Sequence, residues 1–331
     1  MSRRRRAAPA PLPFTRRLAA AALAVAVAGC GTTPAAFAPV AAAVTASRLS
    51  PDLLDEASGL AASRRDDNLL WAHNDSGNAP LLFALDREGN LRGRLRVVGV
   101  GNIDWEDVAT FELDGRSWIL IADVGDNQGE RDEATLLLIA EPDPAKLRPG
   151  RDLDVHVTAY LPVHYPGGPR DCEAVAVDPA HRRILLLSKR QVPALAYELP
   201  LTLDRVEAGR TPEAALVGPL RRLPQPDVLH LVVPTPSGHL RSQPTSLDLS
   251  PDGRTAAVLT YGDIWLYQRR GDEPWGVTFA RRPQRLPSHG LTQAEAVAFS
   301  RDGRELLVTS EGAHAPLLRY ALPARFHSPG G

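Results

Sequence analysis

Glutamates recur at one position of a repeated sequence pattern. The position holds Glu106, Glu173 and Glu295, while two further copies carry Ser58 and Thr245. Three carboxylates that meet in a narrow space repel one another, so a bound cation, a proton or arginines must offset their charge. Oxygen ligands suit a hard cation such as Ca²⁺ better than Zn²⁺, which favours His and Cys. The recurrence therefore predicts a calcium site, provided that the fold brings these side chains together.

Other oxygen-bearing side chains lie close to the recurring position. Acids, Asn and Gly cluster in three further segments, at residues 73–78, 123–127 and 311–312. The predicted metal ligands are Glu106, Glu173, Glu295, Asp104, Asp171, Asp123 and Asp126. The predicted ligand-binding residues are Glu56, Asp75, Asn127, Trp105, Lys189 and Glu311. The alternative for each loop is an ordinary turn, in which Asn, Asp and Gly make capping hydrogen bonds without a metal.

Familiar catalytic motifs do not occur in the chain. The sequence has no Gly-x-Ser-x-Gly, His-Glu-x-x-His, Gly-x-x-x-x-Gly-Lys or Gly-x-Gly-x-x-Gly segment. His73 and His314 fall in predicted rim loops, where each is a candidate general base or an ordinary loop histidine. We therefore assign no catalytic residue from the sequence.

The elements that position these residues form a repeat. Five segments each contain three short apolar strands separated by turns, and the first strands are centred on Leu60, Val108, Val175, Leu247 and Val297. Short sheets repeated every ~40–50 residues are typical of a β-propeller. The wider spacings imply insertions, at residues 141–165 and 203–240. We predict an all-β fold with a single propeller of five visible blades, and residues 228–233 leave a degenerate sixth blade possible.

The two ends of the repeat are predicted to meet. The segment Arg48-Leu49-Ser50-Pro51 precedes the first blade much as Arg285-Leu286-Pro287 precedes the last one. We therefore expect residues 43–49 to form the outer strand of the last blade, beside residues 295–320. Such pairing removes the exposed edge of the ring. The propeller then spans residues 43–322, followed by a tail at 323–331. Because the innermost strands of a propeller begin at one mouth of its central channel, the recurring acids should converge there.

Residues 1–29 have the features of a secretory signal. Six arginines precede the apolar run at residues 18–28, which is shorter than the ~20 residues that a membrane-spanning helix needs. Residues 27–30 read Val-Ala-Gly-Cys, the pattern of a lipoprotein cleavage site, so Cys30 is the predicted lipidation site and residues 30–42 a tether. A conventional signal with a coincidental cysteine is the alternative, and residues 15–18 also allow a twin-arginine signal.

The charge of the chain argues against nucleic acid as a partner, and its cysteine content argues against a disulfide. The whole chain of 331 residues has a formal charge of -1, but without residues 1–29 its 32 basic side chains face 39 acidic ones, a net charge of about -7. Nucleic acid is therefore not an expected partner, because phosphate binding needs clustered positive charge. We expect a monomer anchored to the bacterial cell envelope on the periplasmic or outer-membrane side. Lipidated Cys30 would leave Cys172 as the remaining thiol, and no intramolecular disulfide forms.

Three motifs resemble a known group of proteins. The segments Asp104-Trp105-Glu106-Asp107, Asp123-Val124-Gly125-Asp126-Asn127 and Asp171-Cys172-Glu173-Ala174 are similar to the signature of poorly characterised bacterial secreted propellers. More distantly they resemble the SdiA-regulated and phytase-like propeller groups. The resemblance implies a six-bladed type of propeller with an acidic, calcium-binding face. The phytase-like likeness would place Lys189, Arg190 and Arg131 near a phosphate.

Two functions follow as hypotheses. The first is a lipid-anchored propeller whose acidic rim binds Ca²⁺ and a small ligand or an envelope protein. The second is a calcium-dependent phosphoesterase or other esterase in which the glutamates hold the metal and activate water. An assembly scaffold with no small-molecule site is the remaining alternative.

Overall fold

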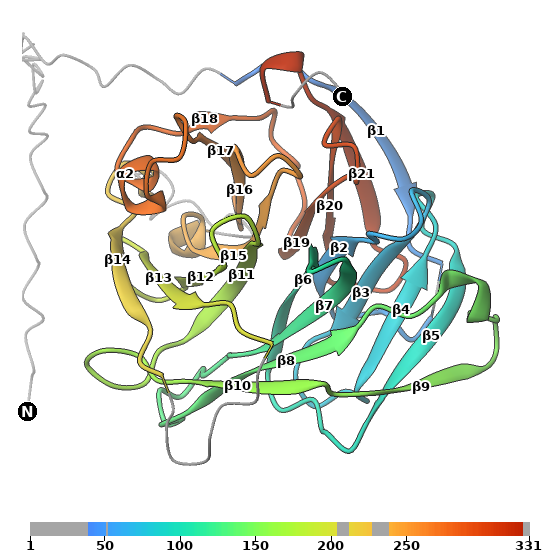
Figure 1. The fold of residues 1–331 in the computed structure, drawn as a ribbon. Coiled ribbons are helices and arrows are strands. Elements are labelled where there is room, and N and C mark those ends of the chain that lie inside the picture. The colour runs from blue at the N-terminus through green and yellow to red at the C-terminus, as the bar shows by residue number, and fades with distance from the viewer. Residues whose placement is uncertain (1–38, 51, 204–211, 227–237, 327–331) are drawn as a thin grey trace, which may run out of the picture. The chain divides into compact units, whose positions relative to one another are not determined.

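The computed structural model describes residues 39–50, 52–203, 212–226 and 238–326. These residues form five β-sheets, which we number as blades 1 to 5, arranged around a central axis (Figure 1). Blade 1 contains β2 (Ala57–Ala62), β3 (Leu70–Asn74), β4 (Leu81–Leu85), β5 (Leu91–Val98) and β9 (Asp152–His156). Blade 2 contains β6 (Trp105–Leu113), β7 (Arg116–Asp123), β8 (Ala134–Ala140) and β10 (Ala159–Val163).

The other three sheets have four strands each. Blade 3 contains β11 (Cys172–Asp178), β12 (Arg183–Ser188), β13 (Leu195–Pro200) and β14 (Ala215–Pro219). Blade 4 contains β15 (Pro244–Leu249), β16 (Thr255–Thr260), β17 (Ile264–Gln268) and β18 (Gln284–Arg285). Blade 5 contains β19 (Ala294–Phe299), β20 (Glu305–Ser310), β21 (Pro316–Ala321) and β1 (Ala43–Arg48). The short helices are η1 (Pro144–Lys146), η2 (Gly238–Leu240), α2 (Trp275–Phe279) and η3 (Ala324–Phe326).

The innermost strands close into a ring. Each contacts the next in the order β2, β6, β11, β15, β19 and back to β2. The predicted propeller is therefore confirmed with five blades, because β11 of blade 3 touches β15 of blade 4 directly. Residues 228–233, which we considered as a sixth blade, lie outside the described residues.

The N-terminal strand completes the last blade, as the sequence predicts. Strand β1 runs antiparallel to β21, with Ala43 opposite Ala321 and Arg48 opposite Pro316. This pairing covers the free edge of blade 5. The insertion at residues 141–165 supplies two outer strands, because β9 runs parallel to β5 and β10 pairs with β8.

Burial explains why the middle strand of each blade is a continuous apolar run. Every residue of β3 and β16 is buried, because the sheets stack on both of their faces. The buried side chains form five clusters, each shared between neighbouring blades. In the part of the chain that the structure describes, no helix has the length and apolar character to cross a membrane.

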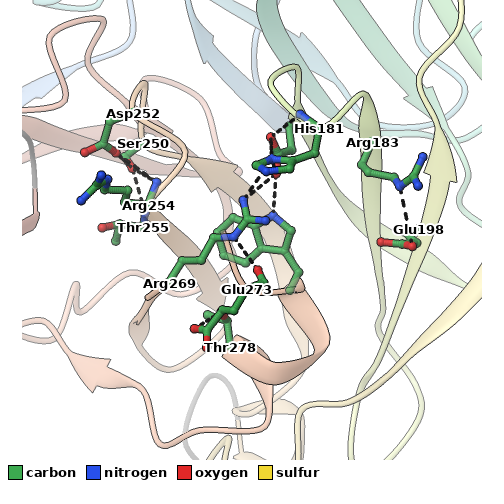
Figure 2. Close-up of polar contacts among 12 residues, drawn as sticks. His181, Arg183, Glu198, Ser250, Asp252, Arg254, Thr255, Arg269, Glu273 and Thr278 are labelled. Atoms are coloured by element: carbon green, nitrogen blue, oxygen red, sulfur yellow. Dashed lines mark hydrogen bonds and ion pairs between the residues drawn. The ribbon is translucent and has the colours of Figure 1, made fainter. Parts of the chain in front are cut away.

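The Asp-Gly turns that the sequence singled out join the first and second strands. In blade 4 the hydroxyl of Ser250 donates to Asp252 Oδ1 at 2.5 Å and accepts from the Thr255 N–H at 2.9 Å (Figure 2). Gly253 has a φ of +66°, which glycine adopts without a steric penalty. The turn at Ser300 repeats the hydroxyl-to-Asp302 bond at 2.6 Å. These turns lie at the end of the channel opposite the glutamates.

Candidate functional site

A β-bulge marks the same place in all five innermost strands. The pairing register shifts between Ala57 and Gly59 in blade 1 and between Trp105 and Asp107 in blade 2, with equivalent shifts in the other blades. The residues skipped are Ser58, Glu106, Glu173, Thr245 and Glu295. A bulge leaves one residue unpaired and re-aims its side chain. The fold therefore turns the recurring position of every blade toward one mouth of the channel.

Three of these positions form the acidic floor of the mouth, and two do not. Ser58 and Thr245 donate to backbone carbonyls of the neighbouring blade, to Glu106 O at 2.8 Å and Ala294 O at 2.7 Å. Glu106, Glu173 and Glu295 are each at most 4% exposed. Blades 1 and 4 thus contribute a hydrogen bond to the neighbouring blade at this position and no carboxylate.

A second ring of residues stands directly after the second strand of each blade. Its members are Asp75, Val124, Lys189, Tyr261 and Glu311. In blades 1, 3 and 5 the backbone of this residue is fixed against the start of the innermost strand. The N–H of Lys189 donates to Asp171 O at 2.9 Å, and that of Asp75 donates to Glu56 O at 2.9 Å. This ring consequently carries acids on blades 5 and 1, a valine on blade 2, and an amine and a phenol on blades 3 and 4.

Lys189 supplies positive charge to the glutamates. Its Nζ lies 2.7 Å from Glu173 Oε2 and 5.2 Å from the centre of the Tyr261 ring. Burial alone would lower the pKa of Lys189, but the carboxylates of Glu173 and Glu295 outweigh it and raise the pKa above its ordinary value. The sequence analysis predicted that a bound cation, a proton or arginines offset the charge of these glutamates, and in the structure a lysine offsets part of it.

One ammonium does not balance three buried carboxylates. Burial raises the pKa of Glu173 to about 7 and that of Glu295 to about 8, and Lys189 opposes both shifts. The pKa of Glu106 is also raised, by burial and then by the neighbouring Glu173. Glu173 Oε1 and Glu295 Oε2 are buried and have no hydrogen-bond partner among the described residues. The floor therefore holds protons at neutral pH and has oxygen atoms with unused bonding capacity.

The carboxylates form two overlapping groups of metal-ligand size. Oxygens of Glu106, Asp171 and Glu173 lie within 4.8 Å of one another, and so do those of Asp75, Asp104 and Glu106. The first group is already compensated, since Lys189 pairs with Glu173 and Arg190 lies 2.5 Å from Asp171. Among the described residues, no cation forms an ion pair with the second group, which we call the outer triad. Burial, followed by the charge of Asp75, raises the pKa of Asp104 to about 6.

Gly125 makes room for the outer triad. A Cβ at this position would lie 2.1 Å from Glu106 Oε1 and 2.5 Å from Asp104 Oδ2. Any larger residue would displace both carboxylates. The Gly125 N–H donates to Asp104 O at 3.2 Å, which fixes the loop against the strand that carries Asp104 and Glu106.

Two predicted metal ligands are used inside their own loop. Asp123 pairs with Arg131 at 2.9 Å, and Asp126 accepts from the backbone N–H groups of Glu130 and Arg131 at 2.8 and 3.1 Å. Neither belongs to a group of closely spaced carboxylates in the described residues. Glu295 also lies outside both groups, across the floor beside Lys189. Asp126 thus makes the capping hydrogen bonds of the alternative, and Asp123 is engaged by the ion pair with Arg131.

The predicted ligand-binding residues divide in the same way. Asp75 joins the outer triad, whereas Trp105 is fully buried and packs edge-on against His73, so its ring has no exposed face for stacking. Glu56 and Glu311 remain on the rim, where each accepts from an amide: Asn78 Nδ2 at 2.6 Å and Gln293 Nε2 at 2.7 Å. Asn127 accepts from Arg190.

One of the two predicted rim histidines differs from expectation, and the other, His314, lies in a loop as predicted. His73 lies within β3 and is fully buried, and burial lowers its pKa, so it is not a rim residue. His314 is in the loop before β21, with Nδ1 3.1 Å from Leu49 O.

Sequence reasoning missed Tyr261. The signal was available, because Tyr261 follows the second strand of blade 4 as Asp75, Lys189 and Glu311 follow theirs. It was overlooked since a tyrosine breaks the pattern of acids and amides. Burial and then the charge of Glu295 raise the pKa of Tyr261, so its hydroxyl stays protonated at neutral pH.

Comparisons with known proteins give no family. No family model matches the chain, and no curated protein matches it. Among solved structures, the chain is similar to the PQQ-bound aldose sugar dehydrogenase of Streptomyces coelicolor, at 11% identity and a TM-score of 0.40, over 86% of this chain and 99% of that one. It is also similar to a chain of a nidogen/laminin complex, at 12% identity and a TM-score of 0.40, over 78% and 73%. Neither likeness indicates an activity for this chain, and the resemblance of its motifs to secreted propellers stays a prediction.

Proposed function

We propose that the channel mouth binds Ca²⁺ at the outer triad and that the bound ion helps to hold a small ligand or an envelope protein. The observation that carries the proposal is that three carboxylates from two blades, Asp75, Asp104 and Glu106, place oxygens within 4.8 Å of one another without a cationic partner among the described residues. Ca²⁺ takes ~6–8 oxygen ligands, so three carboxylates leave positions for water or for a ligand oxygen.

The surroundings of the mouth favour a binding role. Exposed aliphatic side chains stand on three of the loops that carry the site: Leu53, Ile103 and Val192 are 59%, 65% and 73% exposed. Exposed apolar residues around a polar centre are common where a partner docks. The three cations near the site are all engaged, Lys189 by Glu173, Arg190 by Asp171 and Arg131 by Asp123, which disfavours a phosphate as the ligand.

Calcium titration by calorimetry tests the proposal. The protein should bind Ca²⁺ saturably at pH 7.5, and Asp104→Asn should weaken binding by at least about tenfold. Asp52→Asn is the matched control, since Asp52 is exposed near the same rim and pairs with His314, outside the outer triad. A flat trace for the unaltered protein, or equal effects of the two variants, would overturn the proposal.

Hydrolysis is the second candidate function. It is favoured by the raised pKa values of Glu173 and Glu295, which lie near neutrality, where a general acid or base works best. A panel of phosphate and carboxyl esters, assayed with calcium and compared between the unaltered protein and Glu173→Gln, distinguishes the two. Turnover that depends on Glu173 supports a hydrolase, and calcium binding without turnover supports a binding protein.

The envelope location is proposed from the sequence. We propose that Cys30 becomes the lipidated first residue after removal of residues 1–29. Mass spectrometry of the protein purified from bacterial membranes should show a diacylglyceryl modification on Cys30. Release of the unmodified protein into the soluble extracytoplasmic fraction would favour a conventional signal instead.

A further inference from the structure

A cavity lies at the mouth of the channel opposite the glutamates. It has a volume of about 370 Å³ and is lined by residues of all five blades. Small-molecule sites have volumes of ~300–1,000 Å³, so this cavity suits a small ligand. It is separate from the outer triad, because it is built where the innermost strands end rather than where they begin.

Equivalent positions of the five blades form its rim. Four residues beyond Leu60 and its counterparts stand Arg64, Glu112, Pro179, Pro251 and Arg301, and all five line the cavity. One layer deeper, four blades carry alanine and blade 4 carries Asp248. The ring thus combines two arginines and two acids with rigid prolines.

Arg64 and Asp248 are held in place by separate partners. Arg64 Nε donates to Thr110 O at 3.0 Å and to Thr110 Oγ1 at 3.1 Å, and no described residue accepts from its two Nη groups. Asp248 accepts from the Phe299 N–H at 2.7 Å and the Leu249 N–H at 2.8 Å. The two charged groups influence each other, yet no ion pair within 4 Å joins them. Opposite charges are therefore fixed on the wall of one cavity and kept apart.

Two other acids of the wall, Asp252 and Asp178, are already engaged. Asp252 Oδ1 accepts from the Ser250 hydroxyl at 2.5 Å and from the Arg254 N–H at 3.0 Å. Asp178 is buried and accepts from Arg269 Nη1 at 2.9 Å and Trp275 Nε1 at 3.0 Å, and His181 Nδ1 lies 2.9 Å from its carboxylate. Figure 2 shows Arg269 and His181 pointing toward this shared centre between blades 3 and 4. Arg301 is partly engaged as well, since its Nη1 donates to Asp67 at 2.8 Å. Arg64, Asp248 and Glu112 remain as the charges that a ligand would meet.

We propose that this cavity binds a small zwitterion of the amino-acid class, with its carboxylate on the Arg64 guanidinium and its ammonium toward Asp248 and Glu112. A simple anion would meet the two acids, and a simple cation would meet the arginine. A molecule that carries both charges satisfies both sides of the wall. Phe111, Val177 and Leu249 supply apolar surface for its side chain.

Calorimetry with each standard amino acid, in calcium-free buffer, tests the proposal independently of the outer triad. At least one should bind saturably, and its deaminated and decarboxylated analogues should each bind at least about tenfold more weakly, as leucine compares with 4-methylpentanoate and isopentylamine. Binding by no amino acid, or equal binding of an analogue that lacks one charge, would overturn the proposal.

Two variants place the ligand in the cavity. Arg64→Gln should weaken binding by at least about tenfold, whereas Arg96→Gln, which alters an exposed arginine on β5, should leave it unchanged. Should Arg64→Gln fail to fold, Asp248→Asn tests the opposite wall with the same expected loss. Binding that survives both substitutions would place the ligand elsewhere and overturn the proposal.

Discussion

Asp107 joins four of the five blades at the axis, and its replacement by asparagine should strongly destabilise the protein. The carboxylate is fully buried and accepts from the N–H groups of Val175 at 2.9 Å and Leu247 at 3.2 Å, and from that of Val108 at 2.9 Å. It also accepts from the Ser246 hydroxyl at 3.2 Å, and Ser246 in turn accepts from the Val297 N–H at 3.1 Å. One side chain of blade 2 thus links to blades 3 and 4, and through Ser246 to blade 5.

The magnitude follows from these bonds. Asparagine keeps one acceptor oxygen and turns an NH₂ group toward backbone donors, so at least one buried N–H loses its partner, at a cost of about 1–3 kcal/mol. The remaining bonds lose their charge assistance, about 1 kcal/mol each. Burial raises the pKa of Asp107, so removing the charge returns part of this loss. We expect a net loss of about 2–4 kcal/mol in the free energy of unfolding.

Urea unfolding at pH 7 measures this loss as a lower midpoint at unchanged slope. Asp114→Asn is the control, because Asp114 is an exposed turn residue with a φ of +51° that asparagine also accepts, and its pair with Arg182 is on the surface. If Asp107→Asn costs less than about 1 kcal/mol, or no more than the control, the axial network does not stabilise the fold as argued.

Two further predictions concern the mouth. Gly125→Ala should weaken calcium binding by at least about tenfold with little loss of stability, because its Cβ displaces the side-chain ends of Glu106 and Asp104 rather than backbone. The control Gly101→Ala, which has open space around it, should leave the calcium affinity unchanged, and equal calorimetric affinities for the two variants would contradict the proposed geometry. Glu295 has a raised pKa, so the stability that its proton provides is complete below pH ~4.5 and is lost as the pH rises through about 8. Glu295→Gln should therefore reduce the fall in the free energy of unfolding over that range by up to about 1.4 kcal/mol per pH unit. Parallel pH profiles of the two proteins in urea unfolding would refute the pKa shift.

The sequence predicted the fold better than it predicted the site. Strand periodicity and the Asp-Gly turns located the three inner strands of every blade, because strands buried on both faces are continuous apolar runs in the sequence. The match near residues 43–49 located the closing strand. The outer strands β9, β10 and β14 come from the insertions and are half exposed, so they have no continuous apolar run that the sequence would show.

The residues of the site depended on geometry that no local pattern records. The bulge that aims Glu106 and its counterparts is one unpaired residue in an otherwise regular strand. Asp123 and Asp126 have the same residue type as Asp104 but accept hydrogen bonds within their own loop. Lys189 pairs with Glu173 of its own blade, but Tyr261 of blade 4 and Glu295 of blade 5 approach Lys189 only when the ring closes.

Crystals grown with calcium give the most direct test of the proposed cation site. Anomalous scattering recorded at long wavelength should show one peak among Asp75, Asp104 and Glu106, within ~2.3–2.6 Å of an oxygen of each. A calcium peak at Asp123 and Asp126 instead, or no peak in the channel mouth at saturating calcium, would contradict the account.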